Sequence, residues 1–233
     1  FQRRRMEFGG KASIRPVNII LTGNPGTGKT SVARVLGKLF KAMGICSTDR
    51  VIEKSRKDIV GRYANESDKE MDKAVNEAMG GVQVALALGE AGGFPRIMDM
   101  GQCNDSEGLK ALERLMTRME NDRGKFVLVC AGYKAEMGNL MKANPGFQSR
   151  FTHSINIDDY TPDELTEIFR RNCESQGYTL ADGVLEKALS AFRKIVTEKS
   201  GKSFGNAREA RNMLDQCLGM LGARVNALPD SEV

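Results

Sequence analysis

Short apolar runs alternate with amphipathic stretches over the first two thirds of the chain. Runs rich in β-branched residues predict strands, and stretches with apolar residues three or four positions apart predict helices. We expect strands at residues 17–22, 50–54, 82–88, 126–131 and 154–157, and helices at 29–43, 66–79 and 106–120. Strands that alternate with helices are typical of a parallel α/β sheet.

The pattern changes at the segment DDYTP, residues 158–162, beyond which it is helical only. Thr161 is placed to cap a helix, with Pro162 at its first position and Glu164 completing a capping box. Two further amphipathic stripes follow: Val184, Leu185, Ala188, Leu189, Phe192, Ile195 and Val196, then Ala207, Ala210, Leu214, Cys217, Leu218 and Leu221. We therefore expect an α/β domain over residues 1–158 and a small all-helical domain over 159–233.

The segment after the first predicted strand reads Gly23-x-x-x-x-Gly28-Lys29-Thr30, a phosphate-binding loop pattern. Its glycines allow backbone N–H groups to point at phosphate oxygens, and the next helix presents its positive dipole end. Lys29 would reach the phosphates, and the Thr30 hydroxyl would ligate Mg²⁺. An ordinary glycine turn is the alternative. The predicted ATP site comprises Gly23, Asn24, Pro25, Gly26, Thr27, Gly28, Lys29, Thr30 and Ser31.

The amino-acid composition argues against several kinds of metal, disulfide and membrane-spanning structure. The five cysteines form no CxxC pair, which argues against a zinc site or a disulfide scaffold and favours a reducing compartment, cytoplasm or plastid stroma. His153 is the only histidine, so a histidine metal cluster is excluded. A net charge of +5 is weak evidence for nucleic acid, and no apolar run is long enough for a membrane span. The chain begins at Phe1, which suggests a fragment.

Phosphoryl transfer also needs positive groups near the γ-phosphate. Candidates lie in NPGFQSRF (residues 144–151) and FGNAREARN (residues 204–212). With GNPGTGKT, DIVGRY, EAMGG and VLVCAGY, these segments resemble the CbbX/CfxQ group of AAA+ ATPases, which includes red-type Rubisco activases and stage V sporulation protein K relatives. The resemblance runs from about Val17 to about Leu221.

The resemblance implies a P-loop AAA+ sheet with a helical lid, and a hexameric ring, homo- or hetero-oligomeric, that grips or threads a protein client. It implies that Arg150 is an arginine finger acting on a neighbour's nucleotide, and that Arg208 is the sensor 2 arginine. It places sensor 1 near Tyr133 and the pore-loop aromatic at Tyr63. Alternatively, the arginines form ordinary surface ion pairs, Arg208 caps its helix, and Tyr63 packs locally.

One segment departs from this family. Members carry Asp-Glu-Ala at the end of the third strand, whereas this chain reads LALGEA at residues 86–91. Gly89 then stands where the Mg²⁺-binding aspartate belongs, Glu90 stays at the catalytic acid position, and Asp99 is a rival carboxylate. A glycine has no side chain with which to ligate Mg²⁺. We therefore expect ATP binding with weak or absent hydrolysis.

Three functions remain open at this point. The leading one is a remodelling ATPase, Rubisco activase-like and chaperone-like, or a regulatory subunit of a mixed ring. The second is an AAA+ protein acting on nucleic acid, which would need a basic groove that the sequence does not show. The third is a pseudo-ATPase scaffold that does not exchange nucleotide.

Overall fold

A computed structural model describes residues 17–59, 66–86, 106–199 and 204–226. The chain forms two compact units. The sheet unit comprises Phe1–Thr22 and Lys29–Asn156, and the lid unit comprises Gly23–Gly28 and Ile157–Val233. Four residues discussed above, Tyr63, Gly89, Glu90 and Asp99, lie outside the described residues, so their predicted roles stay predictions.

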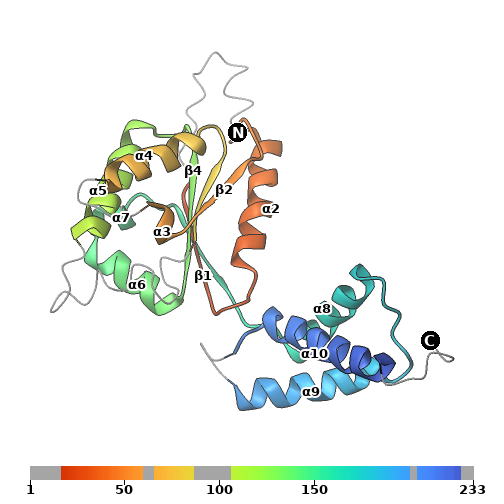
Figure 1. Cartoon of the computed structure of the whole chain (residues 1–233). Helices are drawn as coiled ribbons and strands as arrows, with labels where there is room; N and C mark the ends of the chain where they lie inside the picture. Colours follow the sequence, from red (N-terminus) through yellow and green to blue (C-terminus); the bar gives the residue numbers. More distant parts are fainter. Residues whose placement is uncertain (1–16, 60–65, 87–105, 200–203, 227–233) are drawn as a thin grey trace. The chain divides into compact units, whose positions relative to one another are not determined.

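A five-stranded sheet forms the centre of the sheet unit, in the order β2-β3-β4-β1-β5 (Figure 1). The β2–β3, β3–β4 and β4–β1 pairs are parallel, and Thr22 on β1 is in register with Gly132 on β4. The strands are β1 (Ile19–Gly23), β2 (Val51–Lys54), β3 (Val82–Leu86), β4 (Val127–Gly132) and β5 (His153–Ile157). The predicted parallel α/β sheet is confirmed.

Each face of this sheet has its own apolar core, because successive side chains of a strand point to opposite faces. Ile20, Leu128 and Cys130 face the core beneath α4, α5, α6 and α7. Ile19, Leu21 and the alternate residues of β4 face α2 on the other side. Figure 1 shows α2 alone on one side of the strands and the other helices of this unit on the opposite side.

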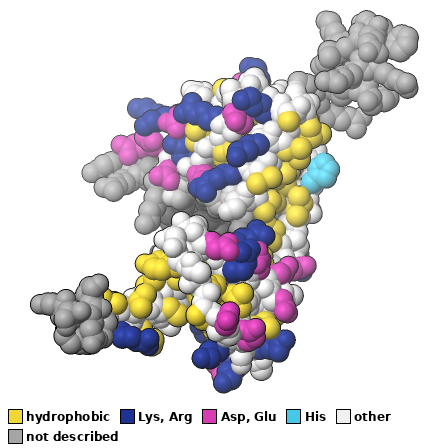
Figure 2. All heavy atoms as spheres, turned by 90° about the vertical axis from the view of Figure 1, so that its right-hand side faces the viewer, with side chains coloured by type: hydrophobic (Ala, Val, Ile, Leu, Met, Phe, Trp, Pro, Cys, Tyr) yellow, Lys and Arg dark blue, Asp and Glu magenta, His cyan; other side chains and the backbone are white. Residues whose placement is uncertain are grey.

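Six helices of the sheet unit are described: α2 (Lys29–Ala42), α3 (Arg56–Ile59), α4 (Ser67–Glu77), α5 (Ser106–Asn121), α6 (Lys134–Ala143) and α7 (Pro145–Gln148). The three longest were predicted, whereas α3, α6 and α7 were not. Some hydrophobic side chains of α2 do not pack in the core, since Val35 and Leu39 are exposed, as is Met43 just after the helix. Exposed hydrophobic side chains form a band on the face shown in Figure 2.

The lid unit contains three helices, α8 (Pro162–Ser175), α9 (Val184–Glu198) and α10 (Ala207–Asn226). The predicted capping box is confirmed: the Thr161 hydroxyl accepts from the Glu164 N–H, and the Glu164 carboxylate accepts from the Thr161 N–H. Phe169, Phe192 and Leu214 centre the core. Cys217 and Leu221 are exposed. The stripe predicted on α10 was therefore wrong at its C-terminal end, where these two side chains lie outside the core of the lid unit.

Candidate nucleotide site

The loop between β1 and α2 has the backbone form that a phosphate cradle requires. Gly26 and Gly28 adopt φ values of +74° and +86°, in the left-handed region that glycine enters without strain. Thr27 is buried and its hydroxyl donates to the Asn24 carbonyl at 3.0 Å, which fixes the turn between them. A turn of this kind gathers successive backbone N–H groups into an anion-binding concavity.

Two side chains and one backbone N–H of the lid unit donate hydrogen bonds to this loop. Asn206, fully buried at 0% exposure, donates to the Pro25 carbonyl at 3.1 Å. The Ala207 N–H at the start of α10 donates to the Gly26 carbonyl at 3.3 Å. The Tyr160 hydroxyl donates to the Thr27 carbonyl at 3.3 Å. Three consecutive carbonyls of the loop therefore have donors from the same unit.

The next residues of the pattern begin α2 in the sheet unit. Lys29 is 8% exposed, and its Nζ lies 5.3 Å from the centroid of the Tyr133 ring. Tyr133 directly follows β4 and precedes α6, at the position predicted for sensor 1. The first turn of α2 contains Thr30 and Ser31 and no acidic residue, so nothing there opposes an anion.

Arg208 lies beside the loop within the lid unit. A Cβ atom built on Gly26 would lie 3.3 Å from the Arg208 Cγ, so the stem of the arginine runs past the loop. Its N–H donates to the Gly205 carbonyl at 3.0 Å, in the turn that starts α10. Arg208 therefore lies near the loop, and its sensor 2 role stays a prediction.

Arg150 occupies a separate location in the sheet unit. Its Nη1 donates to the Gly146 carbonyl at 2.5 Å, and its Nη2 lies 3.8 Å from the Glu120 carboxylate. Its buried Nε has no hydrogen-bond partner among the described residues. Together with Arg123, it lines a cavity of about 400 Å³. Glu120 also lines this cavity, and its carboxylate lies 4.0 Å from the Arg123 Nη1, so the two guanidinium groups share one carboxylate.

A buried amide that the sequence did not single out fixes Arg150. Asn18, which precedes β1, donates from Nδ2 to the Arg150 carbonyl at 3.0 Å. Its Oδ1 accepts from the Leu128 N–H of β4 at 3.0 Å. Asn18 is 6% exposed, so both bonds are shielded from water. Its partners lie 110 and 132 residues away, and the only sequence signal was a polar residue inside an apolar run.

A nucleotide fits these residues better than a protein-held metal does. The left-handed glycines and the buried Lys29 match a polyphosphate. Among the described residues, no three His, Cys, Asp or Glu side chains are arranged to hold a metal ion. The Thr30 hydroxyl is the protein ligand that we expect for Mg²⁺, together with phosphate oxygens. Burial raises the pKa of the Cys130 thiol on β4, so this cysteine stays neutral and unreactive.

A parallel sheet with a phosphate loop after β1, followed by a helical lid, defines the class of P-loop ATPases. The family described as "ATPase family associated with various cellular activities (AAA)" matches residues 19–159, and the AAA lid domain matches residues 161–233. The chain belongs to the AAA family.

Its relatives are named for different processes, secretion and sporulation. The chain is 34% identical to the ESX-1 secretion system protein EccA1 of Mycolicibacterium smegmatis over 218 residues, covering 91% of this chain and 37% of that protein. It is 33% identical to stage V sporulation protein K of Bacillus subtilis over 216 residues, covering 93% and 65%. The chain thus spans about two fifths and two thirds of these relatives.

A solved structure supports the fold alone. The FIGL-1 AAA domain in complex with ADP aligns with a TM-score of 0.53 and 15% identity, covering 83% of this chain and 63% of that one. No helix within the described residues is long and apolar enough to cross a membrane. The compared relatives are bacterial, and nothing among them supports the expected plastid stroma.

Proposed function

We propose that this chain binds ATP with Mg²⁺ at residues 23–31 and works as one subunit of a ring that remodels a protein client. The observation that carries the proposal is the loop itself, with two left-handed glycines followed by the buried Lys29. The family also supports nucleotide binding. Bound Mg²⁺ would supply positive charge to the phosphates, and Thr30 would hold it.

In this proposal, each predicted residue has a separate task. Loop amides and Lys29 hold the phosphates, and Arg208 approaches from the lid. Arg150 reaches the nucleotide of a neighbouring subunit, a role that rests on the resemblance of residues 144–151 to the family motif. Glu90 orients the attacking water, and Tyr63 grips the client. Because Gly89 replaces the family aspartate, we expect slow turnover.

Kinship within the AAA family is also a proposal. The motifs of residues 23–30, 144–151 and 204–212 favour the CbbX/CfxQ group, and the similarity to stage V sporulation protein K supports it. Similar proteins are named for secretion and for sporulation, so their names identify no common client. We therefore propose a protein client and a hexameric ring, without assigning Rubisco.

The test is a titration of the purified chain with a fluorescent ATP analogue in Mg²⁺. We expect Lys29→Ala to weaken binding about 10- to 100-fold, because charge-assisted hydrogen bonds to phosphate are lost. Lys38→Ala, an exposed lysine on the same helix, is the matched control and should bind normally. Equal affinity of wild type and Lys29→Ala would contradict the proposed site.

Hydrolysis and assembly are measured on the same protein. We expect turnover far below the usual 1–1000 s⁻¹ range of enzymes, at roughly 0.01 s⁻¹ or less. Robust turnover that disappears in Lys29→Ala would contradict the expected defect. Analytical ultracentrifugation with and without ATP reports whether rings form, and a monomer under both conditions would count against a homo-oligomer.

A regulatory subunit of a mixed ring is the second candidate. It is favoured by the combination of an altered third-strand segment with an intact Arg150. Such a subunit would hydrolyse little ATP itself but would lend Arg150 to an active neighbour. We expect the chain to change the turnover of an active partner, and Arg150→Ala to remove that change. Unchanged turnover on mixing would exclude this role.

A further inference from the structure

Within the lid unit, three backbone carbonyls of the phosphate loop accept hydrogen bonds from residues near Asn206 and Tyr160. Donors from Asn206, Ala207 and Tyr160 reach the carbonyls of three consecutive loop residues at 3.1, 3.3 and 3.3 Å. The accepting carbonyls belong to Pro25, Gly26 and Thr27. The three donors come from two segments that are 46 residues apart, and Asn206 joins them by accepting from the Tyr160 N–H at 2.9 Å.

The directions of these three carbonyls also determine the directions of the N–H groups that follow them. In a trans peptide, the carbonyl of one residue and the N–H of the next point in opposite directions. The described residues contain no cis peptide bond. Because three carbonyls point toward their donors, the N–H groups of Gly26, Thr27 and Gly28 point away from those donors. A phosphate bound on that side would accept from these N–H groups.

Asn206 is built for this task. It is the only described non-glycine residue with positive φ, at +52°, a conformation that asparagine tolerates better than most side chains. Its amide is fully buried, and its Nδ2 also donates to the Asp159 carboxylate at 2.8 Å. Asp159 in turn accepts from Asn24 of the loop at 2.9 Å. Every polar atom of the Asn206 side chain is thus engaged.

We propose that Asn206, with Tyr160, is a positioning residue that orients the phosphate-binding amides of the loop from the carbonyl side and so raises the affinity for a polyphosphate. This inference rests on the nucleotide site proposed above.

The test compares ADP and AMP affinity in the full chain by isothermal titration calorimetry. Asn206→Gly keeps the backbone conformation accessible and removes only the side-chain bonds. We expect this variant to bind ADP about tenfold more weakly, the size of one or two lost orienting hydrogen bonds. Its AMP affinity should change much less, because the cradle acts on the β-phosphate. A general loosening of the lid would weaken both ligands equally.

Tyr160→Phe supplies a second, gentler test, because it removes one hydroxyl and no packing. We expect about threefold weaker ADP binding, with Tyr178→Phe, an exposed lid tyrosine, as its matched control. If Asn206→Gly does not fold, the Tyr160→Phe result alone decides the inference.

The outcomes separate the two proposals. A wild-type chain that binds no ADP would refute the nucleotide site and this inference with it. A wild-type chain that binds ADP, with folded Asn206→Gly and Tyr160→Phe variants of unchanged ADP-to-AMP ratio, would overturn this inference and leave the nucleotide site intact.

Discussion

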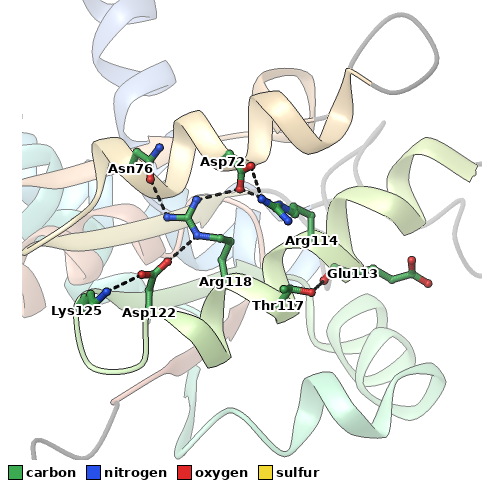
Figure 3. Close-up of polar contacts among 8 residues, drawn as sticks. All are labelled: Asp72, Asn76, Glu113, Arg114, Thr117, Arg118, Asp122 and Lys125. Carbon is green, nitrogen blue, oxygen red and sulfur yellow. Dashed lines mark hydrogen bonds and ion pairs between the residues drawn. The ribbon is translucent and has the colours of Figure 1, made fainter.

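Two polar networks join distant parts of this chain, and they are built in different ways. The first surrounds the buried Asn206 in the lid unit and is mainly neutral, with the exposed Asp159 its one charged member. The second joins α4 to α5 in the sheet unit and consists mainly of charged side chains (Figure 3). In the first, most partners are backbone groups, whereas in the second nearly all are side chains.

The α4–α5 network is redundant. Asp72 on α4 accepts from Arg114 at 2.8 and 2.6 Å and from Arg118 at 2.9 Å. Arg118 also pairs with Asp122 at 2.6 Å, and Lys125 reaches the same carboxylate at 3.0 Å. Each carboxylate therefore has two cationic partners, so losing one leaves another in place.

The Asn206 cluster has no such reserve. Among the described residues, its side chain is the donor to the Pro25 carbonyl and the acceptor for the Tyr160 N–H. A buried polar group that loses its partner keeps the full cost of desolvation. The network at the phosphate loop therefore fixes a precise geometry. The network between α4 and α5 instead holds two helices together and tolerates the loss of one partner.

The largest expected effect comes from Asn206→Asp. This substitution keeps the shape of the side chain but replaces the Nδ2 donor with an oxygen that faces the Pro25 carbonyl and Asp159. An uncompensated buried charge costs about 3–5 kcal/mol. We expect that loss in the free energy of unfolding of the lid unit, measured by hydrogen exchange of α10 amides.

The control for this variant is Asn212→Asp, on the exposed side of the same helix, which should change stability by less than about 0.5 kcal/mol. Similar α10 exchange in Asn206→Asp and wild type would show that the Asn206 cluster tolerates the loss of a partner. That result would contradict the proposed difference between the two networks.

Arg118→Met should have an intermediate effect. Asp72 keeps Arg114, and Asp122 keeps Lys125, so no carboxylate is left without a cation. We expect a loss of about 1–2 kcal/mol, because the replaced guanidinium is only 13% exposed. Hydrogen exchange of α4 and α5 amides measures it, with Arg171→Met, 72% exposed, as the near-neutral control. A loss as large as that of Asn206→Asp would contradict the proposed redundancy.

The smallest effect is a pH dependence confined to the α4–α5 network. The hydrogen bond from Arg114 is the main cause that lowers the pKa of Asp72, and the Lys125 hydrogen bond lowers the pKa of Asp122. A lowered folded-state pKa contributes stability above the unfolded pKa, which is about 4, and this is lost as the pH falls through the folded value.

We therefore expect α4–α5 protection to fall as the pH drops below about 4 in wild type, and to fall less in Asp72→Asn. The neutral-pH cost of that variant should stay below about 1 kcal/mol, as for partly exposed ion pairs. Hydrogen exchange at matched pH values measures both. If α4–α5 protection has the same pH dependence in wild type and Asp72→Asn, Asp72 is not the cause of the acid sensitivity.

Local patterns predicted most of the fold. The buried runs of β1 and β4 and the capping box at Thr161 depend on residues close in sequence, so their pattern was readable. Helix α6 was missed because Gly138 and its polar residues give a weak apolar stripe. The exposure of Leu39 could not be predicted, because a hydrophobic pattern does not reveal whether a second layer covers it.

The candidate site likewise has a part that the sequence could predict and a part that it could not. The phosphate loop is a contiguous pattern, whereas the contacts of Asn206 with Pro25 span 181 residues. Only the folded chain brings such residues together, so no spacing rule identifies them. The roles of Glu90 and Tyr63 stay predictions, because both lie outside the described residues.

Gly26 is constrained twice. Its φ of +74° favours glycine, and a Cβ there would lie only 2.0 Å from the Gly205 carbonyl oxygen. Because that neighbour is backbone, no rotamer change would relieve the overlap, and a matching substitution at position 205 would not help. A saturation library at position 26 should thus retain glycine alone, and no second-site suppressor should arise from the side chain at position 205.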